Sequence, residues 1–448
     1  MSQHTSPRAP ERKWFDSSHA SLCLLGARLR PQEFFRPLEV GVHLKQKVRK
    51  YTPVQKLEMV FVSLLAGAKA LSQTGTTLRV DPALQAAFGL PGCAEQSVLA
   101  QTLDAARDSD VAARRTVVEA SFREHSLVRR HDFAQAVLVL DLDRSPLPAS
   151  KHAEGSERGY MGRCRSRTGR KLVRVRVAAT QETVWEDVLP GNRVETLAVV
   201  EQAVAATERL LGLADDSVEA KERRAQTEWR LDSGWGSEEI INWVLARGYQ
   251  VTGKFKSTSR VQKLVRPITT WEPTSSPGRE VAAVPAPVVL ARACAQYAVR
   301  TPSNDKPGGY YQAVLFSSRT ELGMQAVVDH YDGRAGMEAD LKGDKRGLGL
   351  GVLRKHKLAA QQMVVLLGQW AHNVLIWARS WLAKGAPRLS GCGIVRLVQE
   401  VWAVPGRVKL VAGQLQRVRL NRIHPQARDV CRGFTPLLSP GQTLGFLA

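Results

Sequence analysis

The stretch of residues 331–345, YDGRAGMEADLKGDK, decides how the rest of the chain is interpreted. Four residues within it are separated by three, four and seven positions: Tyr331, Arg334, Glu338 and Lys345. On a helix, with about 100° per residue, this spacing brings the four side chains within roughly 60° of one another. Asp340 falls roughly 200° away from Glu338 on the same helix. The sequence therefore predicts a helical face on which one carboxylate lies among a phenol, a guanidinium and an ammonium group.

The same stretch also has a simpler interpretation. Arg334 and Glu338 are four residues apart and would form an ordinary ion pair on a solvated helix. Gly333, Gly336 and Gly343 weaken the helix prediction, because glycine costs stability inside a helix. The pattern alone leaves both interpretations open, and the rest of the chain has to decide between them.

The net charge is the most informative property of the composition. The 448 residues include 64 Lys and Arg against 42 Asp and Glu, which gives a formal charge of +22. A surplus of this size predicts a polyanionic partner, with nucleic acid ahead of an anionic membrane. A hydrophobic fraction of 44% with 24% charged residues is typical of a globular protein of several domains.

The cysteines and the termini carry little functional signal. The six cysteines contain no CxxC or CxxH pair, which disfavours a zinc ribbon or a disulfide framework and suits a reducing cytosol. The polar start of the chain lacks the features of a secretory signal. The longest uncharged run, residues 358–378, contains Gln361, His372 and Asn373, and we expect a buried helix there and no membrane span.

The hydrophobic periodicity divides the chain into six segments. These are a flexible tail (1–20), a helical domain (21–130), the first part of a mixed α/β core (131–256), a β-rich insertion (257–320), the second part of the core with the Glu338 helix (321–384), and a C-terminal region with helices and a β-hairpin, suited to DNA or dimer contacts (385–448). Thr52 and Asp81, each followed by proline, are predicted to begin helices in the second segment. Beside the basic run 43–50, that segment is either a helix-turn-helix DNA-binding domain or a structural cap with a basic surface.

Acidic residues follow two predicted strands of the core. The apolar run 136–143 ends in Asp141 and Asp143, which share one face of the strand, and the short strand 229–232 ends in Asp232 beside glycines. A carboxylate at the end of a buried strand is costly unless it is paired, hydrogen-bonded or bound to a cation. Two interpretations follow. In the first, Asp143 pairs with Arg144 or with a basic residue of the run 163–176, and Asp232 caps the turn after it. In the second, these acids share a metal site with Glu338.

The order of a strand aspartate, a second strand aspartate, a β-rich insertion and a helix glutamate resembles the DDE transposases of bacterial insertion sequences. The group with a Tyr-(2)-Arg-(3)-Glu-(6)-Lys signature is matched at each position by the four residues of the stretch 331–345. Asp143-Arg-Ser is similar to the first aspartate motif of the family, and Asp232-Ser-Gly-Trp-Gly to the second. The resemblance favours Asp143 over Asp141 and covers about residues 136–384.

The resemblance implies a ribonuclease-H-like catalytic core and metal-dependent DNA chemistry. Asp143, Asp232 and Glu338 would be catalytic and would bind two Mg²⁺ ions, for which Mn²⁺ could substitute, with Asp141 as the alternative to Asp143. The predicted DNA contacts are Tyr331, Arg334, Lys345, Lys254 and Lys256. These residues would serve cleavage at the ends of an insertion sequence and strand transfer into target DNA.

The resemblance also implies partners and a location. The partners are double-stranded DNA, as inverted-repeat element ends and target, and a second copy of the chain in a homodimer on DNA. The location is the bacterial cytoplasm, with association to the nucleoid when DNA is bound, and no membrane is involved. Two alternatives stay open: a ribonuclease-H-like nuclease that hydrolyses without joining, and a domesticated DNA-binding protein without catalysis.

Overall fold

The structure, a computed structural model, describes residues 12–161, 164–191, 194–303 and 309–447. The chain divides into two compact units. The first unit contains the chain up to His125, the short stretch His152–Glu154, and the chain from Lys342 onward. The second unit contains Ser126–Lys151 and Gly155–Leu341.

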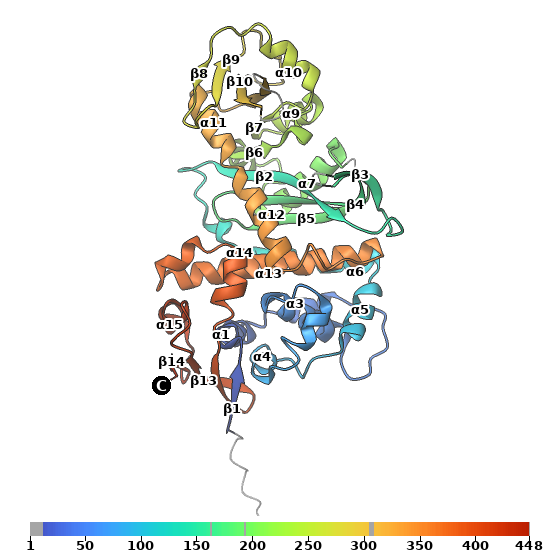
Figure 1. Cartoon of the computed structure of the whole chain (residues 1–448), viewed down its shortest axis with the longest axis vertical. Helices are drawn as coiled ribbons and strands as arrows, with labels where there is room; N and C mark the ends of the chain where they lie inside the picture. The colour runs from blue at the N-terminus through green and yellow to red at the C-terminus, as the bar shows by residue number, and fades with distance from the viewer. Residues whose placement is uncertain (1–11, 162–163, 192–193, 304–308, 448) are drawn as a thin grey trace, which may run out of the picture. The chain divides into compact units, whose positions relative to one another are not determined.

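The first unit combines segments from both ends of the chain (Figure 1). Its helices are α1 (Ala20–Leu29), α2 (Arg36–Gly41), α3 (Pro53–Leu65), α4 (Pro82–Ala87), α5 (Gln96–Asp104), α6 (Asp108–His125), α13 (Leu358–Ala383), α14 (Ile394–Arg396) and α15 (Ala427–Phe434). Its strands are β1 (Arg12–Ser17), β12 (Gly406–Val411), β13 (Gln414–Leu420) and β14 (Thr443–Phe446). Within the described residues they form one sheet in the order β1-β12-β13-β14.

Helix α13 lies in the core of the first unit, as predicted for a buried helix. The Trp370 ring is fully buried, and its centroid lies 4.6 Å from that of Phe34 and 4.5 Å from that of Phe61. This packing explains why α13 groups with the N-terminal helices, although the sequence placed it in the second part of the catalytic core. In the part of the chain that the structure describes, no helix is long and apolar enough to cross a membrane.

Both predicted helix starts in the N-terminal segment are confirmed. The Thr52 hydroxyl accepts a hydrogen bond from the Gln55 N–H (3.1 Å), and the Gln55 side chain accepts one from the Thr52 N–H (3.0 Å). The Asp81 carboxylate accepts one from the Leu84 N–H (2.9 Å). The basic run 43–50 forms neither helix nor strand.

The second unit is built on one large mixed sheet. Its strands are β2 (Leu138–Pro148), β3 (Glu157–Met161), β4 (Cys164–Val177), β5 (Thr183–Leu189), β6 (Thr227–Leu231), β7 (Gln250–Lys254), β8 (Glu272–Pro273), β9 (Glu280–Ala283), β10 (Ala295–Pro302) and β11 (Tyr310–Ser317). Its helices are α7 (Leu197–Leu211), α8 (Val218–Ala225), α9 (Glu238–Ala246), α10 (Thr258–Val265), α11 (Met324–Asp332) and the first part of α12 (Ala335–Gly347). The prediction of a mixed α/β fold is confirmed.

Five strands form the centre of this sheet, in the order β5-β4-β2-β6-β7. Strand β4 runs antiparallel to β5 and β2, whereas β2, β6 and β7 are parallel. The predicted insertion extends the same sheet, because β11 pairs with β7 and is followed by β10, β9 and β8. Within the insertion, residues 288–291 form no strand, and the neighbouring prolines 285 and 287 have no N–H to give to a ladder.

Two sequence predictions near the acids need correction. The first strand was expected to end at Asp143, but β2 continues to Pro148, because its second half pairs with β4 as far as the Pro148–Gly169 pair. The helix over residues 331–345 is also not continuous. Helix α11 ends at Asp332 and α12 begins at Ala335, and between them the Arg334 N–H bonds to the carbonyl of Tyr331 (3.0 Å), three residues back.

The glycines of this stretch explain the break. A Cβ on Gly333 would lie 2.8 Å from Nη1 of Arg230, and one on Gly336 would lie 3.3 Å from Nη2 of Arg176. Any larger residue at Gly333 would therefore displace the guanidinium beneath it. Two of the three glycines that weakened the helix prediction, Gly333 and Gly336, thus let the guanidinium groups of Arg230 and Arg176 lie close to the backbone around the start of α12.

Candidate active site

Asp143 and Asp232 lie at the same level on neighbouring strands. The parallel ladder of β2 and β6 ends at the pair Leu142–Leu231, and each aspartate is the next residue. Asp232 heads the short 3₁₀ turn Ser233–Trp235, but its side chain makes no capping hydrogen bond. The expectation that Asp232 caps that turn is therefore wrong, and its carboxylate is used elsewhere.

One guanidinium lies between the two aspartates. Nη2 of Arg334 is 2.8 Å from Oδ1 of Asp143, and Nη1 is 3.9 Å from Oδ1 of Asp232. Arg334 is only 6% exposed. Burial lowers the pKa of its guanidinium, but the two carboxylates outweigh this effect, so the net shift of the pKa is upward. Arg334, in the break between α11 and α12, therefore points to the two strand aspartates. The simpler interpretation of the sequence had paired it with Glu338.

The pKa of Asp143 is affected by burial and by the charges around it, including those of the other two acids. Burial raises the pKa of Asp143 to about 6, while Arg334 and a hydrogen bond from the Arg144 N–H (2.7 Å) oppose the shift. The negative charges of Asp232 and Glu338 raise it further. Glu338 lies exposed in the first turn of α12. The site is therefore a cluster of negative charge in which the most buried carboxylate needs a nearby cation to stay ionised.

Tyr331 and Lys254 complete the surroundings of Asp232. The Tyr331 hydroxyl donates to Oδ1 of Asp232 (3.5 Å), and burial raises the pKa of this phenol well above its usual range. Nζ of Lys254 lies 5.1 Å above the Tyr331 ring. Burial lowers the pKa of Lys254, and Asp232 opposes that shift. Lys254 and the exposed Lys256 also line a cavity of about 530 Å³.

Asp141, the alternative to Asp143, has a different environment. It is fully buried and accepts hydrogen bonds from Nε and Nη2 of Arg230 (2.7 and 3.0 Å) and from Nη1 of Arg176 (3.2 Å). Nε of Arg176 also pairs with Asp340 (2.5 Å), and Nη1 of Arg230 donates to the carbonyl of His330 (2.7 Å). Asp141 therefore ties the junction of α11 and α12 to the sheet.

Sequence reasoning missed the role of strand β6 in this arrangement. Glu228 and Arg230 of this strand, and Asp232 directly after it, each contact the end of α11 or the residues after it. The carboxylate of Glu228 is fully buried and lies 2.9 Å from Nε2 of His330. Three charged residues at every second position of a short buried strand were the signal that could have found it.

The structure thus brings most, but not all, of the predicted site residues together. Asp143, Asp232, Tyr331, Arg334 and Lys254 are in contact or in direct electrostatic interaction, Glu338 adds its charge to them, and Lys256 lines the neighbouring cavity. Asp340 points to Arg176, as the helix geometry predicted for a residue far from Glu338 on the helix. Lys345 belongs to the first compact unit, and its DNA contact stays a prediction.

The donor set of the site fits a hard divalent cation in type. In the part of the chain that the structure describes, no three His, Cys, Asp or Glu residues are gathered closely enough to hold a metal ion. Yet Asp143 and Asp232 share one positive charge, that of Arg334, and carboxylate oxygens are the ligands such cations prefer. The residue types therefore fit a divalent cation, and in this conformation the Arg334 guanidinium lies between the two carboxylates and offsets their negative charge.

Gly236→Ala tests how tightly the loop after Asp232 is packed. A Cβ at this position would lie 1.8 Å from the carbonyl oxygen of Lys254, so the loop and the end of β7 must separate. We expect a loss of about 1–3 kcal/mol in local stability, measured by hydrogen exchange of the peptides that cover each substituted position. The control is Gly75→Ala, where a Cβ meets open space and a change within about 0.5 kcal/mol is expected. Equal effects of the two substitutions would contradict the packing described.

Comparisons with known proteins give weak similarity. No protein-family model and no curated protein matches the chain. Among solved structures, it is similar to a piggyBac transposase synaptic complex with hairpin DNA, with 12% identity, 89% of this chain and 82% of that chain covered, and a TM-score of 0.48. It is also similar to a pre-cleavage Mos1 transpososome, with 12% identity, 46% and 61% covered, and a TM-score of 0.18. Scores this low add nothing to what the chain's own residues indicate.

Proposed function

We propose that this protein is a DDE-type DNA transposase, which cleaves DNA at the ends of an insertion sequence and transfers the strand to target DNA. The observation that carries the proposal is the meeting of Asp143 and Asp232 around Arg334. These residues come from three separate motifs of the sequence resemblance, and they meet at the ends of a parallel ladder. A chance match of the motifs gives no reason for such a meeting.

The strand arrangement also supports a ribonuclease-H-like core. The neighbouring strands β2, β4 and β5 are antiparallel, and they are followed along the chain by β6 and β7, which run parallel to β2. Ligand sites in sheets with parallel strands lie at the carboxyl ends of those strands. Asp143 and Asp232 occupy that edge of the β2–β6 pair.

The residues of the site have distinct proposed roles. Asp143, Asp232 and Glu338 would hold two Mg²⁺ ions, or Mn²⁺ in their place. When bound, these metals supply Lewis acidity for the attacking and leaving oxygens of a phosphodiester. Arg334 keeps Asp143 ionised by lying 2.8 Å from it. Its guanidinium, the Tyr331 hydroxyl and the ammonium groups of the lysines can donate hydrogen bonds to DNA phosphates.

The remaining parts of the proposal follow from the substrate. Element ends and target are double-stranded DNA, and the net charge of +22 suits such a polyanion. A homodimer on paired ends, and a bacterial cytoplasm with nucleoid association, are proposed on the family resemblance alone.

The test incubates the purified chain with labelled element ends, a target plasmid and Mg²⁺. We expect end cleavage and a covalently joined product, both resolved on a denaturing gel. Cleavage without joining would assign the chain to the nucleases that only hydrolyse. Binding of ends without cleavage in Mg²⁺ or Mn²⁺ would leave a DNA-binding protein and overturn the catalytic proposal.

A further inference from the structure

The sheet of the first unit has two faces of opposite character. On β12 and β13, Val408, Leu410, Leu415, Val418 and Leu420 are buried on one face. The opposite face carries four basic residues: Arg407, Lys409, Arg417 and Arg419. Lys409 is half-buried, and the three arginines are exposed. We name these four residues, with Trp14 of β1, the cationic sheet face.

The positions of these cations work against the stability of the sheet. Arg407 lies directly opposite Arg419, and Lys409 directly opposite Arg417. Like charges placed directly opposite each other destabilise an antiparallel pair. Asp16 is the only acidic residue in the four strands, and its Oδ1 lies 3.2 Å from Nε of Arg407. A sheet that keeps such pairs gives up stability, which is typical of a surface selected for binding.

Three of the cations are also held in place. The guanidinium carbons of Arg407 and Arg419 lie 5.6 and 5.5 Å from the centroid of the Trp14 ring, within cation–π distance. Nε of Arg417 donates to the Thr443 hydroxyl of β14 (2.9 Å). Long cationic side chains lose rotamer entropy when they bind, and side chains that are already ordered lose less.

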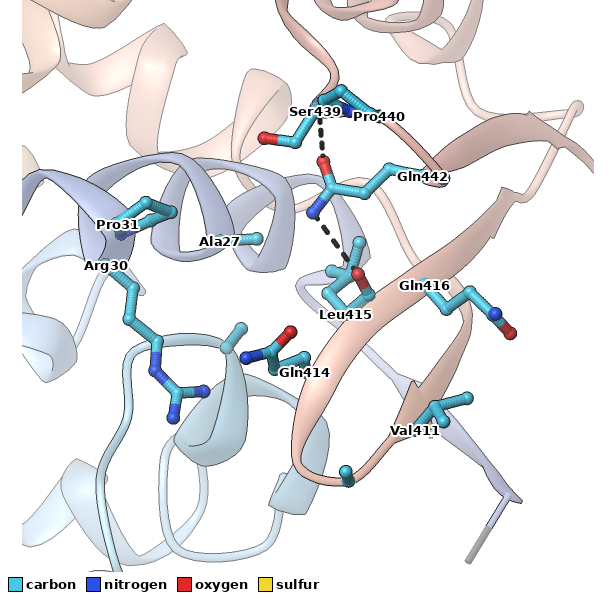
Figure 2. Close-up of a pocket in the computed structure, with 13 residues that line it drawn as sticks. Ala27, Arg30, Pro31, Val411, Gln414, Leu415, Gln416, Ser439, Pro440 and Gln442 are labelled. Carbon is cyan, nitrogen blue, oxygen red and sulfur yellow. Dashed lines mark hydrogen bonds between the residues drawn. The ribbon is translucent and has the colours of Figure 1, made fainter. Parts of the chain in front are cut away.

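The strands that carry these cations are themselves anchored. The β12–β13 turn places Ala412 and Gly413 at φ of 51° and 72°, and the carbonyl of Gly413 accepts from Nη1 of Arg30 (2.9 Å). Figure 2 shows how Gln442, just before β14, accepts from the Ser439 N–H (3.0 Å) and donates to the carbonyl of Leu415 (3.2 Å). These residues border a cavity of about 650 Å³ that contains none of the predicted catalytic residues.

We propose that the cationic sheet face binds the sugar–phosphate backbone of double-stranded DNA. Two rows of cations, with side chains about 5 Å apart across the strands and about 7 Å apart along them, match a chain of regularly spaced anions. Exposed guanidinium groups favour phosphate because they donate in pairs. Among the described residues, the apolar side chains on this face are Trp14 and Val411, and both are half-buried. The face therefore lacks the exposed apolar anchor that an interfacial membrane site uses. The site is separate in sequence from the carboxylates and needs no metal.

The test measures the affinity of the full-length chain for a fluorescent duplex by anisotropy, in EDTA so that no cleavage occurs. The double variant Lys409→Gln/Arg417→Gln should weaken binding on the order of tenfold at about 0.1 M salt. The slope of log affinity against log salt should shrink by about 1.8, since each lost phosphate contact contributes about 0.9. The matched control, Lys384→Gln/Arg388→Gln, removes two exposed cations of the same unit outside this face and should leave affinity and slope near wild type.

Thermal unfolding of the same variants separates binding from folding. Removal of Lys409 and Arg417 should leave the Tm unchanged or raise it, because a like-charge pair is relieved. A lower Tm together with weaker binding would overturn the proposal in favour of a structural role. Equal loss by the control variant would show a general effect of charge and would also overturn it. The proposal would also be overturned if the Lys409→Gln/Arg417→Gln variant bound the DNA duplex like the wild type and lost affinity only for anionic vesicles or for RNA. Because the assay contains no metal, failure here leaves the proposed catalysis untouched, and loss of cleavage leaves this inference untouched.

Discussion

Glu338→Gln is expected to abolish DNA cleavage, with a loss of more than about 100-fold, while binding of element ends survives. The substitution keeps the size of the side chain and removes the charge that acts on Asp143. Changing even an outer partner of a metal ligand costs about 10–100-fold, so loss of a ligand should exceed that range. Cleavage rates are measured under single-turnover conditions with labelled ends, and end binding by gel shift in EDTA.

The matched control is Asp340→Asn, another acid on the same helix. Its carboxylate lies 2.5 Å from Nε of Arg176 and belongs to the buried network around Asp141. We expect Asp340→Asn to reduce stability and to retain measurable cleavage. If Asp340→Asn abolished cleavage and Glu338→Gln did not, the assignment of the catalytic face of α12 would be wrong.

Asp141→Asn should destabilise the second unit by about 3–5 kcal/mol, because it leaves buried guanidinium charge without its carboxylate. Asp141 is fully buried and receives three hydrogen bonds from Arg230 and Arg176. A chain of two compact units need not unfold in one step, so hydrogen exchange of the peptides covering β2 and β6 is the appropriate measurement.

Glu400→Gln provides the comparison for an exposed ion pair. Glu400 pairs with Arg396 one helical turn away at 2.9 Å, and both side chains are about half exposed. Loss of this ion pair should lower the free energy of local opening by less than about 1 kcal/mol, measured by hydrogen exchange of the peptides that cover Glu400. A small effect of Asp141→Asn, similar to that of Glu400→Gln, would show that the buried network does not hold the junction of α11 and α12.

Local patterns in the sequence predicted much of the fold. The helix starts at Thr52 and Asp81 match α3 and α4, and the buried helix expected over residues 358–378 is part of α13. These elements are determined by short-range effects, such as apolar periodicity and capping groups. The same holds for the mixed α/β class, because the order of strands and helices is visible along the chain.

What the sequence could not predict depends on contacts between distant residues. The extension of β2 beyond Asp143 requires its pairing with β4, and the break at Gly333 requires Arg230 on β6 beneath it. Helix periodicity correctly placed Asp340 away from Glu338, but it could not reveal that Arg334 turns to the strand aspartates. Asp141 and Asp143 look alike in sequence, and only their partners distinguish them.

The sheet of the first unit has a consequence for synthesis on the ribosome. Strand β1 pairs with β12, from Arg12 opposite Val411 to Ser17 opposite Gly406, so β1 is translated several hundred residues before its partner. At about 5–20 residues per second, its partner is translated tens of seconds after β1 emerges. During that time an edge with unpaired N–H and C=O groups is open to other chains. Slow translation or early termination should therefore promote aggregation through β1.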